Sequence, residues 1–165
     1  KWLLGDPSKY WFSFASLASL NLGLASPGLY PIGQHSLSLT PEGNLLLFNN
    51  GQGSLNQPAG APAGTSRTFS AVSEYAIDET VRQATEVSRF DHGESIFSPF
   101  CSSVTRTGAQ DAMLVTYSIA DNASRLYLSG VDAQGNVAFE LAYPTTGCNT
   151  AWNAQPIALE ALRLQ

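Results

Sequence analysis

Few side chains in this sequence could do chemistry. The 165 residues include two histidines, His35 and His92, and two cysteines, Cys101 and Cys148. A histidine nitrogen can act as a nucleophile and carry a transferable group, whereas the acidic residues form no close pair of the kind that glycosidases use. His92 lies in the turn sequence DHGE and is predicted to face solvent. His35 is therefore the candidate for chemistry, and a hydrogen-bonded structural histidine is the alternative.

The two cysteines have no C-x-x-C spacing that would indicate zinc or a redox dithiol. In an oxidising compartment they would close a loop of about 47 residues, which the chain-entropy estimate places at roughly 4 kcal/mol of stabilisation. Cys101 opens a predicted four-stranded unit and Cys148 follows its last strand, so we expect a disulfide near one end of that unit. Two unrelated buried thiols are the alternative.

Composition narrows the function classes. Only 13% of the residues are charged and the net charge is −5, so no clustered basic surface for nucleic acid is expected. No apolar run approaches the roughly 20 residues of a membrane-spanning helix. The low Lys content and the abundance of Ser, Thr, Asn and Gly are typical of a secreted or periplasmic protein. Lys1 is not an initiator methionine and no signal peptide is present, so we expect a mature chain or an internal piece of a longer one.

The elements that would position His35 are short strands joined by turns. Residues 33–53 (GQHSLSLTPEGNLLLFNNGQG) hold a strand, a Pro-Glu-Gly-Asn turn and an apolar strand, which together predict a β-hairpin. Two units follow along the chain, each a meander of four strands whose first turn contains Gly43 or Gly108. The predicted strands are 35–39, 44–48, 71–78 and 82–90 in the first unit, and 101–106, 112–119, 125–132 and 136–143 in the second. Residues 52–68 are rich in Gly, Pro, Ala and Ser and predict a loop, with a flexible linker as the alternative.

Repeating four-stranded meanders are the unit of a β-propeller, so we predict an all-β fold with about two antiparallel blades. We predict the last strand of a preceding blade at 1–5 and a covering loop at 6–31, which contains a short helix near 14–20. Two blades follow at 32–92 and 97–145. Residues 150–165 are the start of a next blade or a terminal segment. Trp2, Trp11 and Trp152 are expected to pack between blades. A propeller closes with roughly four to eight blades. The remaining blades, from the same or another chain, are therefore expected partners, because an isolated pair would leave apolar faces and sheet edges open.

Several stretches carry family-specific text. The segment 34–51 follows the order Gln-His, strand, Glu-Gly-Asn, L-L-x-F-N-N-G, and after it come Gln57-Pro58, Ser66-Arg67 and EYAID at 74–78. With KWLLG at 1–5 and Phe-Ser-Pro at 97–99, this order resembles the bacterial arylsulfotransferase (aryl-sulfate sulfotransferase) family over residues 1 to about 118. The resemblance implies a six-bladed propeller whose central funnel moves a sulfuryl group from one phenol to another through a histidine intermediate. It implies no nucleotide donor, no cofactor and no metal.

The resemblance also assigns residues. His35 falls on a funnel histidine that helps to bind the sulfuryl group and is not the nucleophile, and Asn50 and Arg67 fall on substrate-binding positions. A loop-bracing cation is the alternative for Arg67. The chain departs from the family at Ser54, where a basic residue is expected, and in the strand near 112–121, which contains no nucleophilic histidine.

Three functions remain open at this point. The first is part of an arylsulfotransferase-like enzyme, acting on a phenolic sulfate ester and degenerate in catalysis. The second is a non-catalytic propeller that binds another small molecule or a protein at its funnel, which the missing histidine favours. The third is a structural subunit of a surface assembly.

Overall fold

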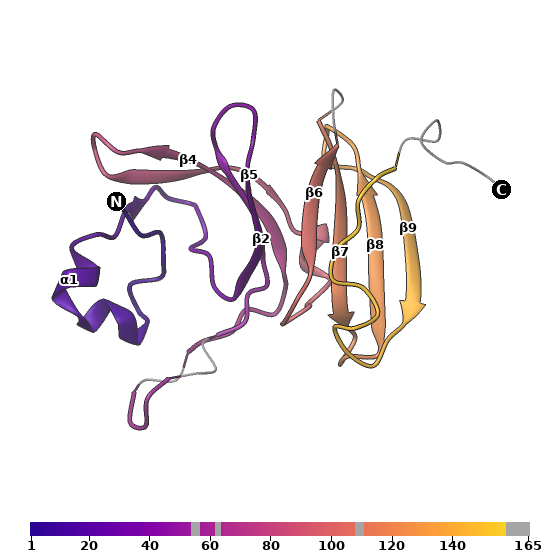
Figure 1. The fold of residues 1–165 in the computed structure, drawn as a ribbon, viewed down its shortest axis with the longest axis horizontal. Helices are drawn as coiled ribbons and strands as arrows, with labels where there is room; N and C mark the ends of the chain where they lie inside the picture. Colours follow the sequence, from indigo (N-terminus) through magenta and orange to yellow (C-terminus); the bar gives the residue numbers. More distant parts are fainter. Residues whose placement is uncertain (54–56, 62–63, 108–110, 158–165) are drawn as a thin grey trace.

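The computed structural model describes residues 1–53, 57–61, 64–107 and 111–157, and strands dominate it (Figure 1). The helical elements are short, and the strands fall into two sheets that lie side by side. In chain order the elements are η1 Tyr10–Ser13, α1 Ala15–Ala18, β1 Gly23–Leu24, β2 Gln34–Leu39, β3 Leu45–Asn49, β4 Ala71–Asp78, β5 Gln83–Phe90, η2 His92–Glu94, β6 Ser103–Thr107, β7 Ala112–Ala120, β8 Arg125–Val131 and β9 Val137–Pro144.

Both sheets are antiparallel meanders. The first has the order β1-β5-β4-β3-β2, in which β2 to β5 are antiparallel neighbours and the short β1 adds in parallel to the outer edge of β5. The second has the order β6-β7-β8-β9. The all-β prediction and the two four-stranded units are confirmed, with strand ends within about two residues of the predicted ones. The turn predicted around Gly108 lies outside the described residues, and closure into a propeller remains a prediction.

The main core lies between the two sheets, which pack face to face. Alternate residues of each strand point to opposite faces, and the apolar positions of β3 and β7 meet across this interface. Phe48 and Tyr117 contact edge to face, with ring centroids 5.3 Å apart. The buried cluster consists of Leu46, Phe48, Val72, Phe90, Ile96, Val104, Met113, Val115, Tyr117, Ala120 and Val131.

Polar contacts also join the sheets. Arg106 of β6 reaches Glu74 of β4 with 2.6 Å between Nη2 and Oε2, and Asn44 donates to the second oxygen of Glu74 at 2.7 Å. The hydroxyl of Ser36 on β2 donates to Val104 O at 3.1 Å. These bonds fix β2 and β4 against β6, and so fix the relative position of the two sheets.

The other face of the first sheet is covered by residues 1–33. Leu22, next to β1, is 1% exposed there, and the short helix predicted near 14–20 is present as α1. Residues 1–5, predicted as the last strand of a preceding blade, make one parallel bridge, Leu3 with Asn21. Their place in a larger propeller stays a prediction.

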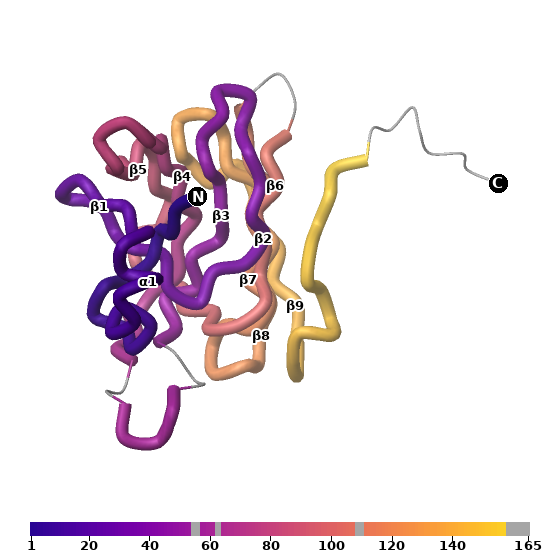
Figure 2. Tube along the Cα trace, turned by 60° about the vertical axis from the view of Figure 1, so that its left-hand side comes forward, coloured from indigo at the N-terminus to yellow at the C-terminus, as the bar shows by residue number. Residues whose placement is uncertain are grey.

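The other face of the second sheet is open only in part, because Thr116 and Leu126 on it are buried. Phe139, Leu141 and Tyr143 of β9 are 45–49% exposed on it. Residues 145–157 run beside the sheet (Figure 2), and Thr105 Oγ1 donates to Ala154 O at 3.1 Å. In the predicted terminal segment, residues 150–157 form no strand, and residues 158–165 lie outside the described ones.

None of the three tryptophans lies between the two described sheets, and their packing against further blades stays a prediction. Trp152 is 67% exposed, Trp2 donates to Glu79 at 3.3 Å, and Trp11 donates to Asp6 O at 3.1 Å within the segment before β1. The physical reason is that phenylalanine, tyrosine and aliphatic side chains fill the space between the sheets. No helix in the described part of the chain has the length and apolar character needed to span a bilayer.

Candidate functional site

The Asn49-Asn50-Gly51 segment at the end of β3 contacts three parts of the chain. Asn49 is fully buried, and its Oδ1 accepts from Ile32 N at 3.0 Å. Asn50 is also fully buried, and its Nδ2 donates to the main-chain carbonyls of Ser98 and Cys101. Gly51 has φ +77°, and a Cβ there would lie 2.5 Å from Phe69 O. The motif thus has a physical basis, because each of its three positions requires its own residue type.

His35 lies directly against this motif. Its Nδ1 is 2.7 Å from Asn50 Oδ1 and 3.2 Å from Gly33 O. The register of β2 against β3 shifts between His35 and Ser38, and Ser36 adopts φ +57°. This β-bulge redirects the strand beside the histidine. The bond from Ser36 to Val104 then holds the bulge against β6.

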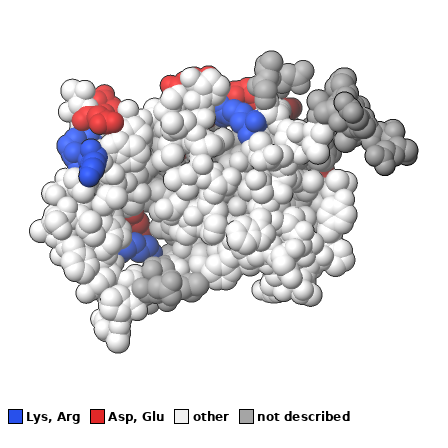
Figure 3. Space-filling view, viewed as in Figure 1, with Lys and Arg blue, Asp and Glu red and all other residues white. Residues whose placement is uncertain are grey.

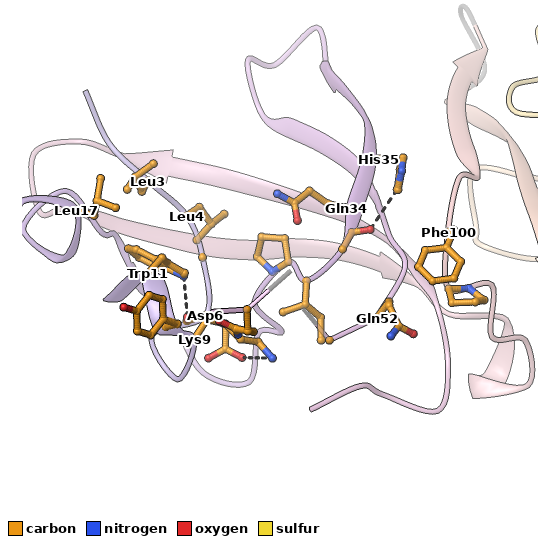
Figure 4. Close-up of a pocket in the computed structure, with 18 of the residues that line it drawn as sticks. Leu3, Leu4, Asp6, Lys9, Trp11, Leu17, Gln34, His35, Gln52 and Phe100 are labelled. Atoms are coloured by element: carbon orange, nitrogen blue, oxygen red, sulfur yellow. Dashed lines mark hydrogen bonds and ion pairs between the residues drawn. The ribbon is translucent and has the colours of Figure 1, made fainter. Parts of the chain in front are cut away.

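A groove of about 740 Å³ opens next to His35 (Figure 4). Figure 4 shows His35 and Phe100 at one end and Trp11 and Leu17 at the other. The volume falls in the range of small-molecule sites, which are also mostly apolar. The described walls come from residues 3–17, 31–35, 52–53, 57–58 and 99–100, and their aromatic members are Tyr10, Trp11, Phe14 and Phe100.

Charge in the groove is sparse. Among its described lining residues the charged side chains are Asp6 and Lys9, which form an ion pair at 4.0 Å. The molecular face in Figure 3 is mostly uncharged, with acidic and basic side chains along its upper margin and a further acidic and basic pair in a hollow lower on its left side. The groove therefore suits an aromatic ligand that offers one polar group to His35.

The second ring nitrogen of His35 is available for such a group. Nε2 has no hydrogen-bond partner within the described residues, and it is not a buried atom. The structure thus brings His35 and Asn50 together at the groove, with Asn50 behind the histidine and closed off from solvent.

Arg67 lies elsewhere. Its Nη2 donates to Tyr30 O and its main-chain N donates to Gly51 O at 2.8 Å, and it does not line the groove. Burial lowers the pKa of its guanidinium, while the nearby Tyr75 and Glu86 act in the opposite direction. Substrate binding by Arg67 stays a prediction, and its contacts are those of a cation that braces the loop.

The neighbours of Arg67 hold the same loop. Tyr75 Oη donates to Leu29 O at 2.5 Å, and Leu29 N donates to Glu86 at 3.0 Å. Asn49 Nδ2 donates to Tyr30 O at 3.3 Å. Together these residues fix the path of the chain into Gly33 and His35.

A cluster of buried serines lies next to Asn50. Each member is at most 3% exposed, and the members are Ser70, Ser98, Ser102 and Ser118. Ser70 Oγ donates to Asn50 O at 2.8 Å, and Ser98 Oγ lies 2.9 Å from Ser102 Oγ. The predicted disulfide between Cys101 and Cys148 is confirmed, with Cα atoms 6.0 Å apart. Cys101 O is also one of the two carbonyl oxygens that accept from the Asn50 amide. Sequence reasoning missed this cluster, because serines in FSPFCSS are also ordinary loop residues.

His92 is not the solvent-facing turn residue that was predicted. It starts the turn η2, but its ring contacts Phe90 and Tyr117 at centroid distances of 6.0 and 6.3 Å. Nδ1 lies 2.8 Å from Ser95 Oγ and Nε2 lies 3.0 Å from Glu140 Oε2. The reason for the error is tertiary, since β9 brings Glu140 to the end of β5. Both nitrogens of His92 are therefore occupied.

The described residues contain no group of three or more His, Cys, Asp or Glu side chains that could hold a metal ion. The absence of a metal or cofactor from the function stays a prediction. The chemistry available in the groove is that of one imidazole nitrogen beside aromatic walls.

The fold is that of an all-β chain of two antiparallel sheets, and His35 lies on β2, the edge strand of the first sheet. The comparison with known families makes this specific: the sequence model of the family described as Arylsulfotransferase (ASST) matches residues 1–153. The chain belongs to the arylsulfotransferase family. A search of the curated proteins found none that matches it.

Proposed function

We propose that this chain forms part of an arylsulfotransferase-like propeller that transfers a sulfuryl group between phenolic compounds. The observation that carries the proposal is the free Nε2 of His35 at one end of an aromatic groove. The groove would take the aryl ring by apolar contact, because aromatic rings bury large area at low entropic cost. His35 would bind the sulfuryl group or the phenolic oxygen to which it is attached.

The chain supplies only part of the catalytic machinery in this proposal. His35 has a binding role, Asn50 acts behind it, and Arg67 contributes by holding the loop that leads to His35. The nucleophilic histidine comes from outside these residues, since His92 is occupied on both nitrogens. Preorganised donors around a developing charge are usually the largest catalytic contribution, and losing one costs roughly 3 to 4 kcal/mol.

The proposed propeller is supported by the likeness of the two sheets. The second sheet covers one face of the first, and its own far face carries the exposed Phe139, Leu141 and Tyr143. We propose that a third blade packs on this face as the second packs on the first. Such a blade belongs to the same polypeptide or to another chain. The disulfide supports a periplasmic or secreted location, because disulfides persist in oxidising compartments.

The proposal is tested with a chromogenic aryl sulfate as donor and a phenol as acceptor. We expect the purified 165-residue chain to bind the aryl sulfate, to lose this binding on His35→Asn, and to show no turnover, because two sheets cannot enclose a funnel. His92→Asn is the matched control and should bind as the unchanged chain does. Turnover by the chain alone, lost on His35→Asn and accompanied by a sulfohistidine at position 35, would show that His35 is the nucleophile instead.

A second candidate function is a non-catalytic propeller that binds an aromatic ligand. The absence of a histidine from β7, whose sequence is AMLVTYSIA, favours it. A complete assembly that binds phenols and aryl sulfates without exchanging the sulfuryl group would support this function over the enzymatic one.

A further inference from the structure

The orientation of the Asn50 side-chain amide follows from its partners. Nδ2 lies 2.7 Å from Ser98 O and 3.0 Å from Cys101 O, and both are carbonyl oxygens that can only accept. A reversed amide would set an oxygen against two oxygens in a fully buried place. Oδ1 is therefore the atom that lies 2.7 Å from His35 Nδ1.

This orientation decides which nitrogen of His35 carries the proton. An amide oxygen has no proton to give, so Nδ1 must donate to it. Gly33 O, 3.2 Å from the same nitrogen, is also an acceptor and favours the same arrangement. In the neutral ring the lone pair then resides on Nε2.

We propose that Asn50 is a positioning residue that commits Nδ1 of His35 as a donor and leaves Nε2 as the nitrogen that meets a ligand in the groove. Histidines in other sites are oriented in the same way by a partner on the opposite nitrogen. The bond also fixes the ring, because the amide is itself held by two main-chain carbonyls. One of these is the carbonyl of a cysteine in a disulfide, so the support is rigid.

The arrangement selects between ligand chemistries, a consequence that rests on the proposed function. A neutral His35 offers a lone pair at Nε2, which accepts a hydrogen bond from a phenol hydroxyl. A sulfate ester has no proton to give, so it binds well only to a ring that also carries a proton on Nε2. The charged side chains that share the groove with His35 are the paired Asp6 and Lys9. Neutral His35 therefore favours the phenol over its sulfate ester.

The test is the tautomer of His35, read by nitrogen NMR of the 165-residue chain at a pH where the ring is neutral, with His92→Gln used to assign the signals. Free imidazole side chains in water favour the proton on Nε2. We expect the opposite for His35, with the proton on Nδ1. Asn50→Ala should shift the population toward the Nε2–H form. Ser98→Ala, the matched control, removes the hydroxyl that contacts Ser102 and Ile119 N but keeps the carbonyl that Asn50 uses, and should leave the tautomer unchanged.

A wild-type ring with the proton on Nε2 would overturn the proposal, as would an Asn50→Ala variant that retains the Nδ1–H form, since Gly33 would then be the positioning group. If Asn50→Ala does not fold, the wild-type tautomer and the Ser98→Ala control still decide. Phenol and phenyl sulfate are then titrated separately into the chain. An Nδ1–H ring that responds to neither ligand would leave Asn50 as a positioning residue and refute the proposed function instead.

Discussion

His35 and His92 are attached to the same four-stranded meander, one on its first strand β2 and the other just after its last strand β5. At His92 both ring nitrogens have partners, Ser95 and Glu140, and the ring packs on Phe90 and Tyr117. At His35 one nitrogen is bound to a buried amide, and the other lies beside a groove with no partner in the described part of the chain. A histidine whose two ring nitrogens are both hydrogen-bonded, such as His92, has a structural role. A histidine with one accessible nitrogen, such as His35, can still bind a ligand.

The supports of the two rings differ as well. The His92 side chain is 23% exposed, and its partner Glu140 is 29% exposed. His35 is held by Asn50, which is fully buried and joined to the serine cluster and to the disulfide loop. Damage to the support should therefore be costly at His35 and mild at His92.

Reduction of the disulfide should give the largest effect. Cys101 and Cys148 are separated by 47 residues, and opening a loop of that length lowers the free energy of unfolding by about 4 kcal/mol. Because Cys101 O accepts from Asn50, the NMR signals of His35 should move while those of His92 stay. Urea unfolding with and without reductant measures the first effect. A loss of less than about 1 kcal/mol in the free energy of unfolding would contradict this prediction. NMR signals that move more at His92 than at His35 would contradict it as well.

Asn50→Ala should come next. It removes the amide that donates to Ser98 O and Cys101 O, and of these two Ser98 O keeps a bond from the Ser70 hydroxyl at 3.2 Å. A buried carbonyl that loses its donor costs roughly 1 to 3 kcal/mol, so the free energy of unfolding should fall by about 2 kcal/mol. His92→Gln is the matched variant on the other side. It breaks a partly exposed ion pair and should cost less than about 1 kcal/mol. Equal losses in urea unfolding would contradict the claim that the two supports differ.

Two buried tyrosines give an effect that is absent at neutral pH and appears only at high pH. Burial raises the pKa of Tyr75, in the loop support near His35, to about 12, and burial raises the pKa of Tyr117, beside His92, further. The unfolded chain ionises near pH 10 while the folded chain does not, so stability is lost as pH rises above about 10. Each tyrosine contributes a slope of roughly 1.4 kcal/mol per pH unit until it ionises in the folded state.

Tyr117→Phe separates the two sides of this effect. The Tyr117 hydroxyl is buried and has no hydrogen-bond partner among the described residues, so the removal of this hydroxyl should not lower stability at neutral pH. Tyr75 donates to Leu29 O, and Tyr75→Phe should therefore cost about 1 kcal/mol at neutral pH. Each variant should remove about half of the pH dependence. Urea midpoints between pH 9 and pH 12 measure it, and an unchanged slope for both variants would refute the assignment.

Much of the scaffold was predictable from the sequence. Alternating apolar residues and turn residues gave the eight meander strands, because a half-buried strand needs one apolar face and a tight turn needs Gly, Asn or Pro. The Cys101–Cys148 pair followed from its place at the two ends of one unit. His35 and Asn50 were identified because they lie in sequence motifs typical of the family. Their separation along the chain did not predict that the two side chains are in contact.

The rest depends on tertiary packing. The groove is built from residues 3–17 together with Phe100, which only the fold brings near His35. The partner of His92 is Glu140, which lies 48 residues further along the chain, so the local sequence suggested an exposed turn. The serine cluster and the left-handed conformation of Ser36 have no local signature, because serine is common in loops and glycine is the residue usually expected at such a bulge.

The most direct measurement of the central claim is one NMR titration of the 165-residue chain with phenyl sulfate and then with phenol, in which both histidine rings are followed at once. While the His35 ring is neutral, we expect phenol to shift the His35 signals, above all Nε2, to saturation at a lower concentration than phenyl sulfate does. Phenyl sulfate should bind better once Nε2 also carries a proton, and the His92 signals should not move with either ligand. A saturating shift at His92, or shifts at neither ring, would contradict the assignment of His35 as the chemical histidine of this chain.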